Sequence, residues 1–317
     1  MGSEKQSRLL SFEQALQVSL PSPEIALHHR WKNPQNVSVF VKRDDQIHNI
    51  ISGNKWRKLE SSLNACRANK IKDIISFGGG HSNHLHALSY CCWKLGIGFT
   101  AIIRGDYTNN PTPTVIDLLK WQTNIQYVDK KTYQRRSDPD YLSSIKSQYP
   151  DAAIIPEGGS QEQALEGVAA LVDELEQHYD VIIVPVASGA TMAGLIKATN
   201  KLPTKVVGIA ALKGHGYLED LVEQFLPEEL HQVNGNCHWH IEHNFHHGGY
   251  AKSPPELRDF CRQFLETSGF QIEPVYSGKL FFALKHMIET SFFETNQRVL
   301  AIHTGGLQGA RDSLLNS

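Results

Sequence analysis

Residues 181–194 read VIIVPVASGATMAG: an apolar run, then a turn of small residues, then the start of a helical pattern. The run Val181–Val186 is continuously apolar instead of alternating in polarity, which is typical of a strand that helices cover on both faces. A strand, a small-residue turn and a helix in this order form half of a βαβ unit. The stretch therefore predicts an α/β fold with a parallel sheet.

The same alternation of strand and helix extends in both directions along the chain. Further strands are expected at 73–77, 99–104, 125–129, 152–156, 206–211 and 299–303. Helical patterns fall at 81–95, 112–122, 141–148, 161–178, 191–199, 217–225, 255–267 and 279–292. Because sheets usually have about four to six strands, we expect two doubly wound domains with mostly parallel sheets, of roughly four and six strands. The larger domain would comprise residues 1–57 and 158–317, and the smaller one residues 58–157.

The composition excludes several classes of protein. The 317 residues include 31 Lys and Arg against 33 Asp and Glu. The resulting net charge of −2 does not suit a protein that binds nucleic acid along its phosphates, and no apolar run is long enough to span a membrane. The five cysteines form no CxxC pair, and residues 1–20 contain no apolar signal segment. Both features predict a cytoplasmic protein with reduced thiols.

Three glycine-containing segments carry residues suited to binding an anion. The segment GNKWRKLE at 53–60 places basic residues at a predicted helix start, where the helix dipole prefers anions. The segment GGGHSNH at 78–84 follows a strand, and ASGATMAG at 187–194 leads into a helix. Glycines let backbone N–H groups approach a ligand. Each segment alone is equally compatible with a structural role, as a solvated helix start, a tight turn or a helix cap.

Together the segments resemble the pyridoxal-phosphate (PLP) enzymes of the tryptophan-synthase-β fold, and within them the branch of D-cysteine desulfhydrase and 1-aminocyclopropane-1-carboxylate (ACC) deaminase. The matching motifs, in the family's order from Lys42 to Gly306, are KRDD, GNKWRKLE, GGGHSNH, PEGGS, ASGATMAG, EPVYSGKL and HTGG. The resemblance implies PLP as the cofactor, bound between the two domains. It also implies a small amino acid as the substrate, and a homodimer.

The resemblance further implies roles for individual residues. The catalytic residues would be Lys55, which binds the cofactor covalently, Ser82, near the substrate carboxylate or in proton transfer, and Tyr276, which stacks near the cofactor. Lys58 and residues 188–191 would hold the phosphate of the cofactor, and Asn83 its ring oxygen. The cofactor-binding set is then Lys55, Lys58, Asn83, Ser188, Gly189, Ala190, Thr191, Ser277 and Thr304.

The residue after Tyr276 bears on the reaction. It is Ser277, where the ACC deaminases carry an acidic residue, and Thr304 of the HTGG turn is a second hydroxyl expected near the ring. A hydroxyl can hydrogen-bond to a neutral pyridine nitrogen but cannot keep it protonated as a carboxylate does. We therefore expect α,β-elimination from D-cysteine to pyruvate, ammonia and hydrogen sulfide. ACC deamination and a catalytically inactive PLP or amino-acid binding protein are the alternatives, whereas a Rossmann dinucleotide enzyme would need a GxGxxG motif.

A histidine-rich segment, Cys237–His247, contains several residues that can bind a metal ion. No second cluster of Cys or His completes a recognised zinc-ligand spacing. We therefore expect no metal site. The segment is instead interpreted as a strand leading to Gly248–Tyr250, which resembles the family's glycine-tyrosine loop.

Overall fold

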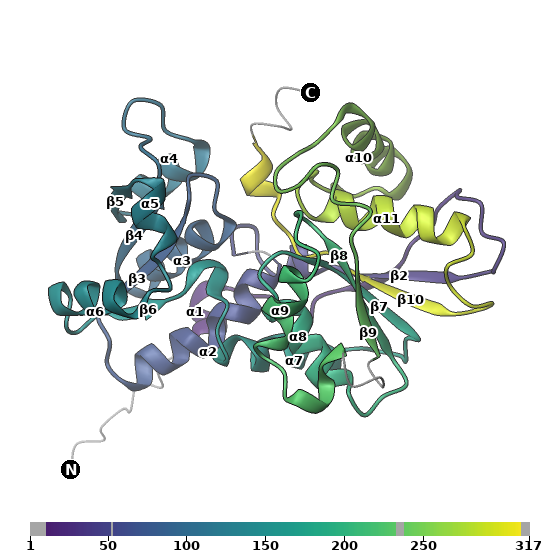
Figure 1. The fold of residues 1–317 in the computed structure, drawn as a ribbon, viewed down its shortest axis with the longest axis horizontal. Helices are drawn as coiled ribbons and strands as arrows, with labels where there is room; N and C mark the ends of the chain where they lie inside the picture. The colour runs from purple at the N-terminus through teal and green to yellow at the C-terminus, as the bar shows by residue number, and fades with distance from the viewer. Residues whose placement is uncertain (1–10, 52, 233–237, 312–317) are drawn as a thin grey trace, which may run out of the picture.

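The strands of the protein form two separate sheets, as the computed structural model shows for residues 11–51, 53–232 and 238–311 (Figure 1). The larger sheet has six strands in the order β1-β2-β10-β7-β8-β9, and the smaller has four in the order β5-β4-β3-β6. Apart from the antiparallel pair β1 and β2, all neighbouring strands are parallel. The predicted pair of mostly parallel sheets is confirmed.

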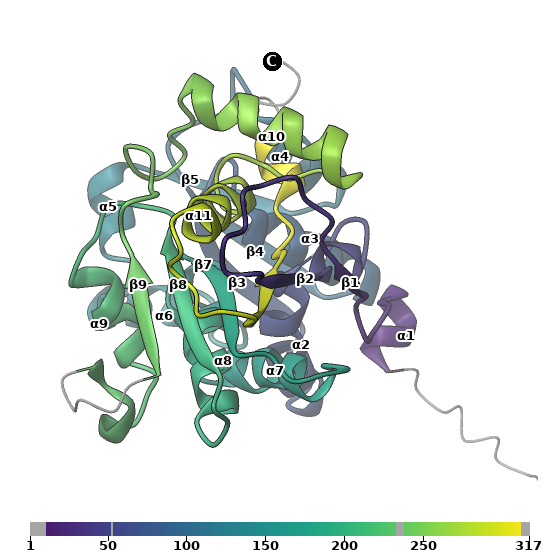
Figure 2. The same ribbon diagram turned by 90° about the vertical axis from the view of Figure 1, so that its right-hand side faces the viewer.

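Helices cover both faces of the six-stranded sheet. Its strands are β1 (Glu24–Ala26), β2 (Ser38–Lys42), β7 (Val181–Val186), β8 (Lys205–Ala210), β9 (Trp239–Glu242) and β10 (Arg298–Ile302). One face packs on α10 (Pro255–Ser268) and α11 (Ser277–Glu289), and the other on α7 (Gln163–Asp173), α8 (Ala190–Thr199) and α9 (Tyr217–Glu223), as Figure 2 shows. Successive strand residues alternate between these two cores: Ile183 belongs to the first and Ile182 to the second. This double burial is why the strands are apolar without a break.

The four-stranded sheet follows the same plan. Its strands are β3 (Asp73–Gly79), β4 (Gly98–Arg104), β5 (Asn124–Val128) and β6 (Ala153–Ile155), and its helices are α3 (Asn83–Leu95), α4 (Pro113–Lys120), α5 (Lys130–Gln134) and α6 (Pro139–Gln148). The remaining elements are α1 (Phe12–Leu16), α2 (Asn54–Ala68) and the 3₁₀ turns η1 (Asp44–Gln46), η2 (Glu157–Gly159), η3 (Glu228–Leu230) and η5 (Leu307–Ala310). No helix within the three described ranges has the length and apolarity needed to cross a membrane.

Local capping explains where the helices of the smaller sheet begin. The Thr112 hydroxyl accepts a hydrogen bond from the Val115 amide at the start of α4, and the Asp138 carboxylate accepts from the Tyr141 amide at the start of α6. A proline follows each cap, at the first position of the helix. Proline has no N–H, and an N–H at this position would have no partner within the helix. Helix α3 ends at Gly96, whose φ of 67° is the left-handed conformation that favours glycine.

Helix α2 connects the two sheets. Its residue Arg57 is 2% exposed and forms ion pairs with Asp44 at 2.7 Å and with Glu174 at 2.8 Å, and Glu174 also pairs with Lys42 at 3.1 Å. Part of the basic cluster that the sequence analysis assigned to an anionic ligand is therefore neutralised by the protein's own carboxylates. The predicted domain boundary between residues 57 and 58 falls inside this continuous helix.

Several elements differ from the sequence-based expectation, among them β1, β2 and α7. Strands β1 and β2 were not expected, because a three-residue strand and a five-residue strand carry little periodicity. Helix α7 ends at Asp173 and not at residue 178. The next residue, Glu174, is held by Arg57 and Lys42, and the chain then turns toward β7.

Candidate active site

A cavity of about 800 Å³ lies where the strands of both sheets end. Its wall includes Gly79–His84 after β3, Arg104 at the end of β4, and Glu157 after β6. From the larger sheet come Val186–Gly189 after β7 and Thr304–Gly306 after β10. In an open parallel sheet, ligands bind at the carboxyl ends of the strands. The position of the cavity therefore makes it the candidate active site.

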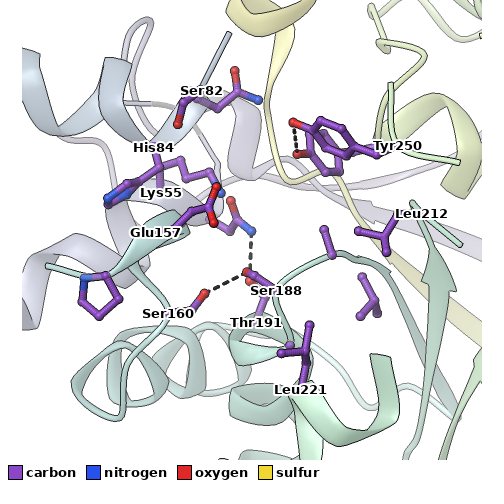
Figure 3. A pocket seen from close by; sticks show the side chains of 18 of the residues that line it. Lys55, Ser82, His84, Glu157, Ser160, Ser188, Thr191, Leu212, Leu221 and Tyr250 are labelled. Carbon is purple, nitrogen blue, oxygen red and sulfur yellow. Dashed lines mark hydrogen bonds between the residues drawn. The ribbon is translucent and has the colours of Figure 1, made fainter. Parts of the chain in front are cut away.

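Lys55 extends into this cavity from the first turn of α2 (Figure 3). The turn before it needs glycine: Gly53 has a φ of 69°, and a side chain there would clash with the Thr304 carbonyl group. Asn54 fixes the helix start by donating to the Thr191 hydroxyl at 2.9 Å. Burial lowers the pKa of the Lys55 amine to about 8, so a larger share of this amine is neutral than is usual for lysine.

Lys58 lies one turn further along α2 and behind the wall. Its ammonium group donates to the Gly158 carbonyl oxygen at 3.0 Å, to the Ser160 hydroxyl at 3.0 Å and to the Ser188 hydroxyl at 3.2 Å. Ser160 in turn donates to Ser188 at 2.8 Å (Figure 3). The pKa of Lys58 is held well below its usual range, mainly by burial and to a lesser extent by the charge of Lys55. Lys58 thus joins the turn after β6 to the turn after β7.

The turn after β7 ends in the N-terminus of α8. Ser188, Gly189 and Thr191 line the cavity, whereas Ala190 lies behind it with its amide donating to the Ser188 carbonyl oxygen at 2.9 Å. The first-turn amides of a helix lack intrahelical partners and attract anions. A side chain on Gly189 would clash with the Leu221 carbonyl group, so the close approach of α9 explains this glycine.

The turn after β3 presents three polar side chains. The Ser82 hydroxyl caps α3 by accepting from the Leu85 amide at 3.2 Å, and its own hydrogen stays available for donation. His84 contacts the Ser76 hydroxyl at 2.8 Å, and burial, with the nearby charges of Lys55 and Lys58, holds its pKa well below its usual range. The side-chain oxygen of Asn83 is buried without a partner in the structure. A buried amide oxygen of this kind indicates a missing donor.

Two tyrosines meet on the opposite side of the cavity. The Tyr276 hydroxyl donates to the Tyr250 hydroxyl at 3.2 Å (Figure 3). The loop that carries Tyr250 is held by Lys279, a fully buried residue whose ammonium group donates to the Gly249 carbonyl oxygen at 2.8 Å and to the Ala211 carbonyl oxygen at 2.7 Å. The sequence pointed to the loop only through its resemblance to the family's glycine-tyrosine loop, and no role was expected for Tyr250, His84 or Lys279.

Ser277, which was expected among the cofactor contacts, is not on the cavity wall. Its side chain is fully buried and donates to the Glu273 carboxylate at 3.1 Å. The same carboxylate accepts from the amides of Tyr276 at 2.8 Å and Ser277 at 2.7 Å. Burial raises the pKa of Glu273 to about 7. Thr304, the other expected hydroxyl, does line the cavity.

The structure thus brings most of the predicted residues to one cavity. Those on its wall are Lys55, Ser82, Asn83, Ser188, Gly189, Thr191, Tyr276 and Thr304. Lys58, Ala190 and Ser277 lie outside the wall, Lys58 in contact with it through Ser188.

In the part of the chain that the structure describes, no group of three or more His, Cys, Asp or Glu residues could hold a metal ion. Cys237, at the start of the histidine-rich segment, lies outside the described residues. Within the segment, His243 instead contacts the Glu219 carboxylate at 2.7 Å.

The family model described as "Pyridoxal-phosphate dependent enzyme" matches residues 22–305, which cover most of the chain and all of the motifs above except the final glycine, Gly306. The chain belongs to this family of PLP-dependent enzymes. Its cofactor is PLP, and the alternative of a Rossmann dinucleotide enzyme is excluded.

Individual relatives agree with this assignment. A provisionally named ACC deaminase of Pyrococcus abyssi is 30% identical over 286 residues, which cover 86% of each chain. A bifunctional D-cysteine desulfhydrase/ACC deaminase of Arabidopsis thaliana, a mitochondrial protein, is 28% identical and covers 93% of this chain and 78% of its own. Among solved structures, an ACC deaminase homologue superposes with a TM-score of 0.77 at 24% identity, covering 96% of this chain and 98% of its own.

The residues of the cavity fit PLP. The amides of the turn at 188–191 and the α8 N-terminus suit a phosphate group, with Lys58 close behind them. The Asn83 side chain has an unpartnered buried oxygen, and its amide nitrogen lies close to Gly306, where a side chain would come within 3.1 Å of that nitrogen. Lys55 would supply the amine to which PLP attaches. Of these groups, the Asn83 oxygen is the one that is buried without a protein partner, and bound PLP would lie beside it.

Removing the Lys58 amine should weaken PLP binding. In Lys58→Met, the Ser188 and Ser160 hydroxyls lose their shared donor, and a bound phosphate, whose negative charge would favour the protonated amine, loses a nearby cation; hydrogen bonds to charged groups contribute about 1.5–3 kcal/mol. We expect the PLP dissociation constant to rise about tenfold to a hundredfold, measured by titrating the apoprotein and following cofactor absorbance. The control is Lys70→Met, at an exposed lysine just beyond α2. Equal dissociation constants for the two variants would contradict this role.

Proposed function

We propose that this PLP-dependent enzyme is a lyase that catalyses α,β-elimination from D-cysteine, giving pyruvate, ammonia and hydrogen sulfide. One observation carries the proposal. The amine of Lys55, whose pKa is lowered to about 8, lines the same cavity as three hydroxyl groups, those of Ser82, Tyr276 and Tyr250. These are the groups that an elimination needs to take up and return protons. The relatives support it as well, because D-cysteine desulfhydrase and ACC deaminase occur among their names.

The chemistry of the wall favours elimination over opening of the ACC ring. Bound PLP supplies an electron sink for the carbon that loses a bond. The wall offers Thr304 as a hydroxyl, and among the described residues that line the cavity the one carboxylate is Glu157, which the smaller sheet contributes. A neutral ring nitrogen makes a weaker sink. Such a weaker sink is sufficient for elimination, because hydrosulfide is a good leaving group. It is less suited to opening the ACC ring, which requires cleavage of a carbon–carbon bond.

Each polar group of the wall has a defined state that suits its proposed role. The Lys55 amine, with its pKa lowered to about 8 by burial, can accept a proton near neutral pH. Burial holds the pKa of Tyr276 well above its usual range, so its hydroxyl stays protonated and donates. The Ser82 hydroxyl is fixed at the α3 N-terminus, where the helix dipole also favours a substrate carboxylate.

Removal of either hydroxyl should affect chemistry more than cofactor retention. Ser82→Ala and Tyr276→Phe each delete one oxygen and keep most of the packing, while a positioned proton-transfer group contributes about 10²–10⁴-fold to rate. We expect losses of kcat in this range, with unchanged PLP absorbance. Steady-state kinetics and spectra of the purified variants test this. If both variants retain the parent kcat, the proposed roles of these hydroxyls are wrong.

The reaction itself is tested with a panel of D-cysteine, L-cysteine, D-serine, L-serine and ACC, assayed for keto-acid product. We expect pyruvate from D-cysteine and little product from ACC. Efficient ACC turnover would favour the deaminase alternative. Binding of PLP without turnover of any amino acid would favour an inactive binding protein.

We also propose a homodimer, a cytoplasmic location and a division into residues 1–57 with 158–317 and residues 58–157. Resemblance to the family supports the dimer. The free, buried cysteines Cys66, Cys91, Cys92 and Cys261 support a reducing compartment. The division is supported by the strands of the four-stranded sheet, which all lie between residues 73 and 155. Sedimentation of the holoprotein and limited proteolysis test the assembly and the division.

A further inference from the structure

The part of the cavity wall formed by the smaller sheet carries charged groups that proton transfer and cofactor binding do not require. Arg104, Arg136 and Glu157 line the cavity there. They come from three different segments: the end of β4, the residues after α5, and η2. We call this group, together with Tyr133 behind it, the charged wall.

Glu157 is held firmly within the charged wall. Its carboxylate accepts a hydrogen bond from the Tyr133 hydroxyl at 2.7 Å and another from the Arg136 side chain at 2.5 Å. Tyr133 is itself 4% exposed, and burial raises its pKa, so its hydroxyl remains a donor. The charge of Glu157 is therefore matched by Arg136, and both groups are fixed in place.

Arg104 has no such carboxylate partner in the described part of the chain. Its guanidinium carbon lies 5.6 Å from the centre of the Tyr133 ring, on which the Arg136 guanidinium also packs, at 5.1 Å. The Arg104 side chain is exposed and lines the cavity. Burial raises the pKa of Tyr250 on the other side, and the charge of Arg104 reaches far enough to oppose that rise slightly. Two guanidinium groups and one carboxylate leave one positive charge on this wall.

The positive charge of Arg104 has no anionic partner among the groups of cofactor and substrate that are assigned so far. The cofactor phosphate is assigned to the turn at 188–191, and the α-carboxylate of the substrate to Ser82 at the α3 N-terminus. Neither D-cysteine nor ACC has a second anionic group. A guanidinium group matches a carboxylate in charge and in bidentate geometry. The wall therefore suits a longer substrate with an anion at the end of its side chain.

We propose that Arg104, braced by Tyr133, Arg136 and Glu157, binds an anionic group at the end of the substrate side chain, so that the preferred substrates are β-substituted amino acids with a terminal carboxylate. The inference rests on the proposed elimination and names its substrate class. For S-carboxymethylcysteine, the Cα–H and Cβ–S bonds break, and sulfur leaves with the bonding electron pair as the thiolate of thioglycolate. One water is consumed, and pyruvate and ammonia are released.

A matched pair of substrates tests the proposal. S-Carboxymethylcysteine and S-carbamoylmethylcysteine have nearly the same size and differ in the charge of the terminal group. Both are assayed with the holoenzyme, alongside unsubstituted cysteine of the same configuration. We expect kcat/KM to be at least about tenfold higher for the carboxylate than for the amide, because hydrogen bonds to charged groups exceed those between neutral groups.

The variant Arg104→Gln should lower kcat/KM for the carboxylate substrate about tenfold to a hundredfold. The loss should appear mainly in KM, because the contact is remote from the reacting atoms and is made equally before and during the reaction. Values for the amide substrate and for cysteine should stay within about twofold of the parent. The control is Arg135→Gln, an exposed arginine that pairs with Asp138 at 3.7 Å and does not line the cavity.

The outcomes separate failure of the inference from failure of the proposed function. Turnover of cysteine with equal kcat/KM for the carboxylate and amide substrates would overturn the inference and leave the elimination standing. An equal loss for all three substrates in Arg104→Gln would overturn it too, because Arg104 would then bind the α-carboxylate. Absence of keto acid from all three substrates would overturn the elimination itself.

Discussion

Replacing Lys55 with methionine should abolish turnover, with a loss of about 10⁴-fold or more. Methionine has a similar length and shape but no amine to take up a proton or bind the cofactor. The first turn of α2 is fixed by Gly53 and Asn54, so the fold should remain. Kinetics on the best amino acid of the panel measure the loss, and circular dichroism checks the fold.

Chemical rescue separates loss of the amine from loss of structure. Added methylamine can enter a cavity of about 800 Å³ and replace the missing group in part. We expect turnover of Lys55→Met to rise with methylamine concentration. Retention of parent activity by Lys55→Met without added amine would show that another group performs the chemistry.

Arg57→Met should cause the largest loss of stability, about 3–5 kcal/mol, because it leaves the buried Asp44 carboxylate without its cation. Asp44 is fully buried, and it accepts two hydrogen bonds from Arg57, at 2.7 and 2.8 Å. Glu174 accepts two more, at 2.9 and 2.8 Å. Denaturant unfolding of the apoprotein measures the change in free energy.

The matched control is Arg135→Met, at an exposed ion pair with Asp138. Exposed pairs contribute about 0–1 kcal/mol, so this variant should unfold close to the parent. If Arg57→Met lost no more stability than the control, the ion pairs around Arg57 would not secure α2.

The strands around the cavity could be predicted because their apolar runs are continuous, as at Val181–Val186. The parallel arrangement then places the residues after the strands at one edge of each sheet, which explains why Ser188 and Thr304 of the larger sheet line the same cavity; Ser82 reaches it from the corresponding edge of the smaller sheet. The same rule applies to Arg104, which ends β4, and Glu157, which follows β6. Arg104 and Glu157 could therefore have been predicted as residues of the site by searching the carboxyl end of every predicted strand for polar side chains.

Other features depend on which way a side chain turns. Ser277 begins α11, and its hydroxyl points back to Glu273, four residues earlier, while its neighbour Tyr276 faces the cavity. The role of Arg57 depends on Glu174, 117 residues further along the chain. No local pattern reports such a pairing, so the basic cluster around α2 could not be divided in advance into ligand-binding and structural cations.

We expect Lys55, and not its neighbour Lys58, to carry the cofactor. Both lie in the first turns of α2, but Lys55 lines the cavity, whereas the ammonium group of Lys58 is held by three oxygen atoms. Borohydride reduction of the holoprotein fixes PLP to its lysine, and peptide mass spectrometry identifies that residue. We expect the modification on Lys55; modification of Lys58 or of any other lysine would show that the amine of Lys55 does not bind the cofactor.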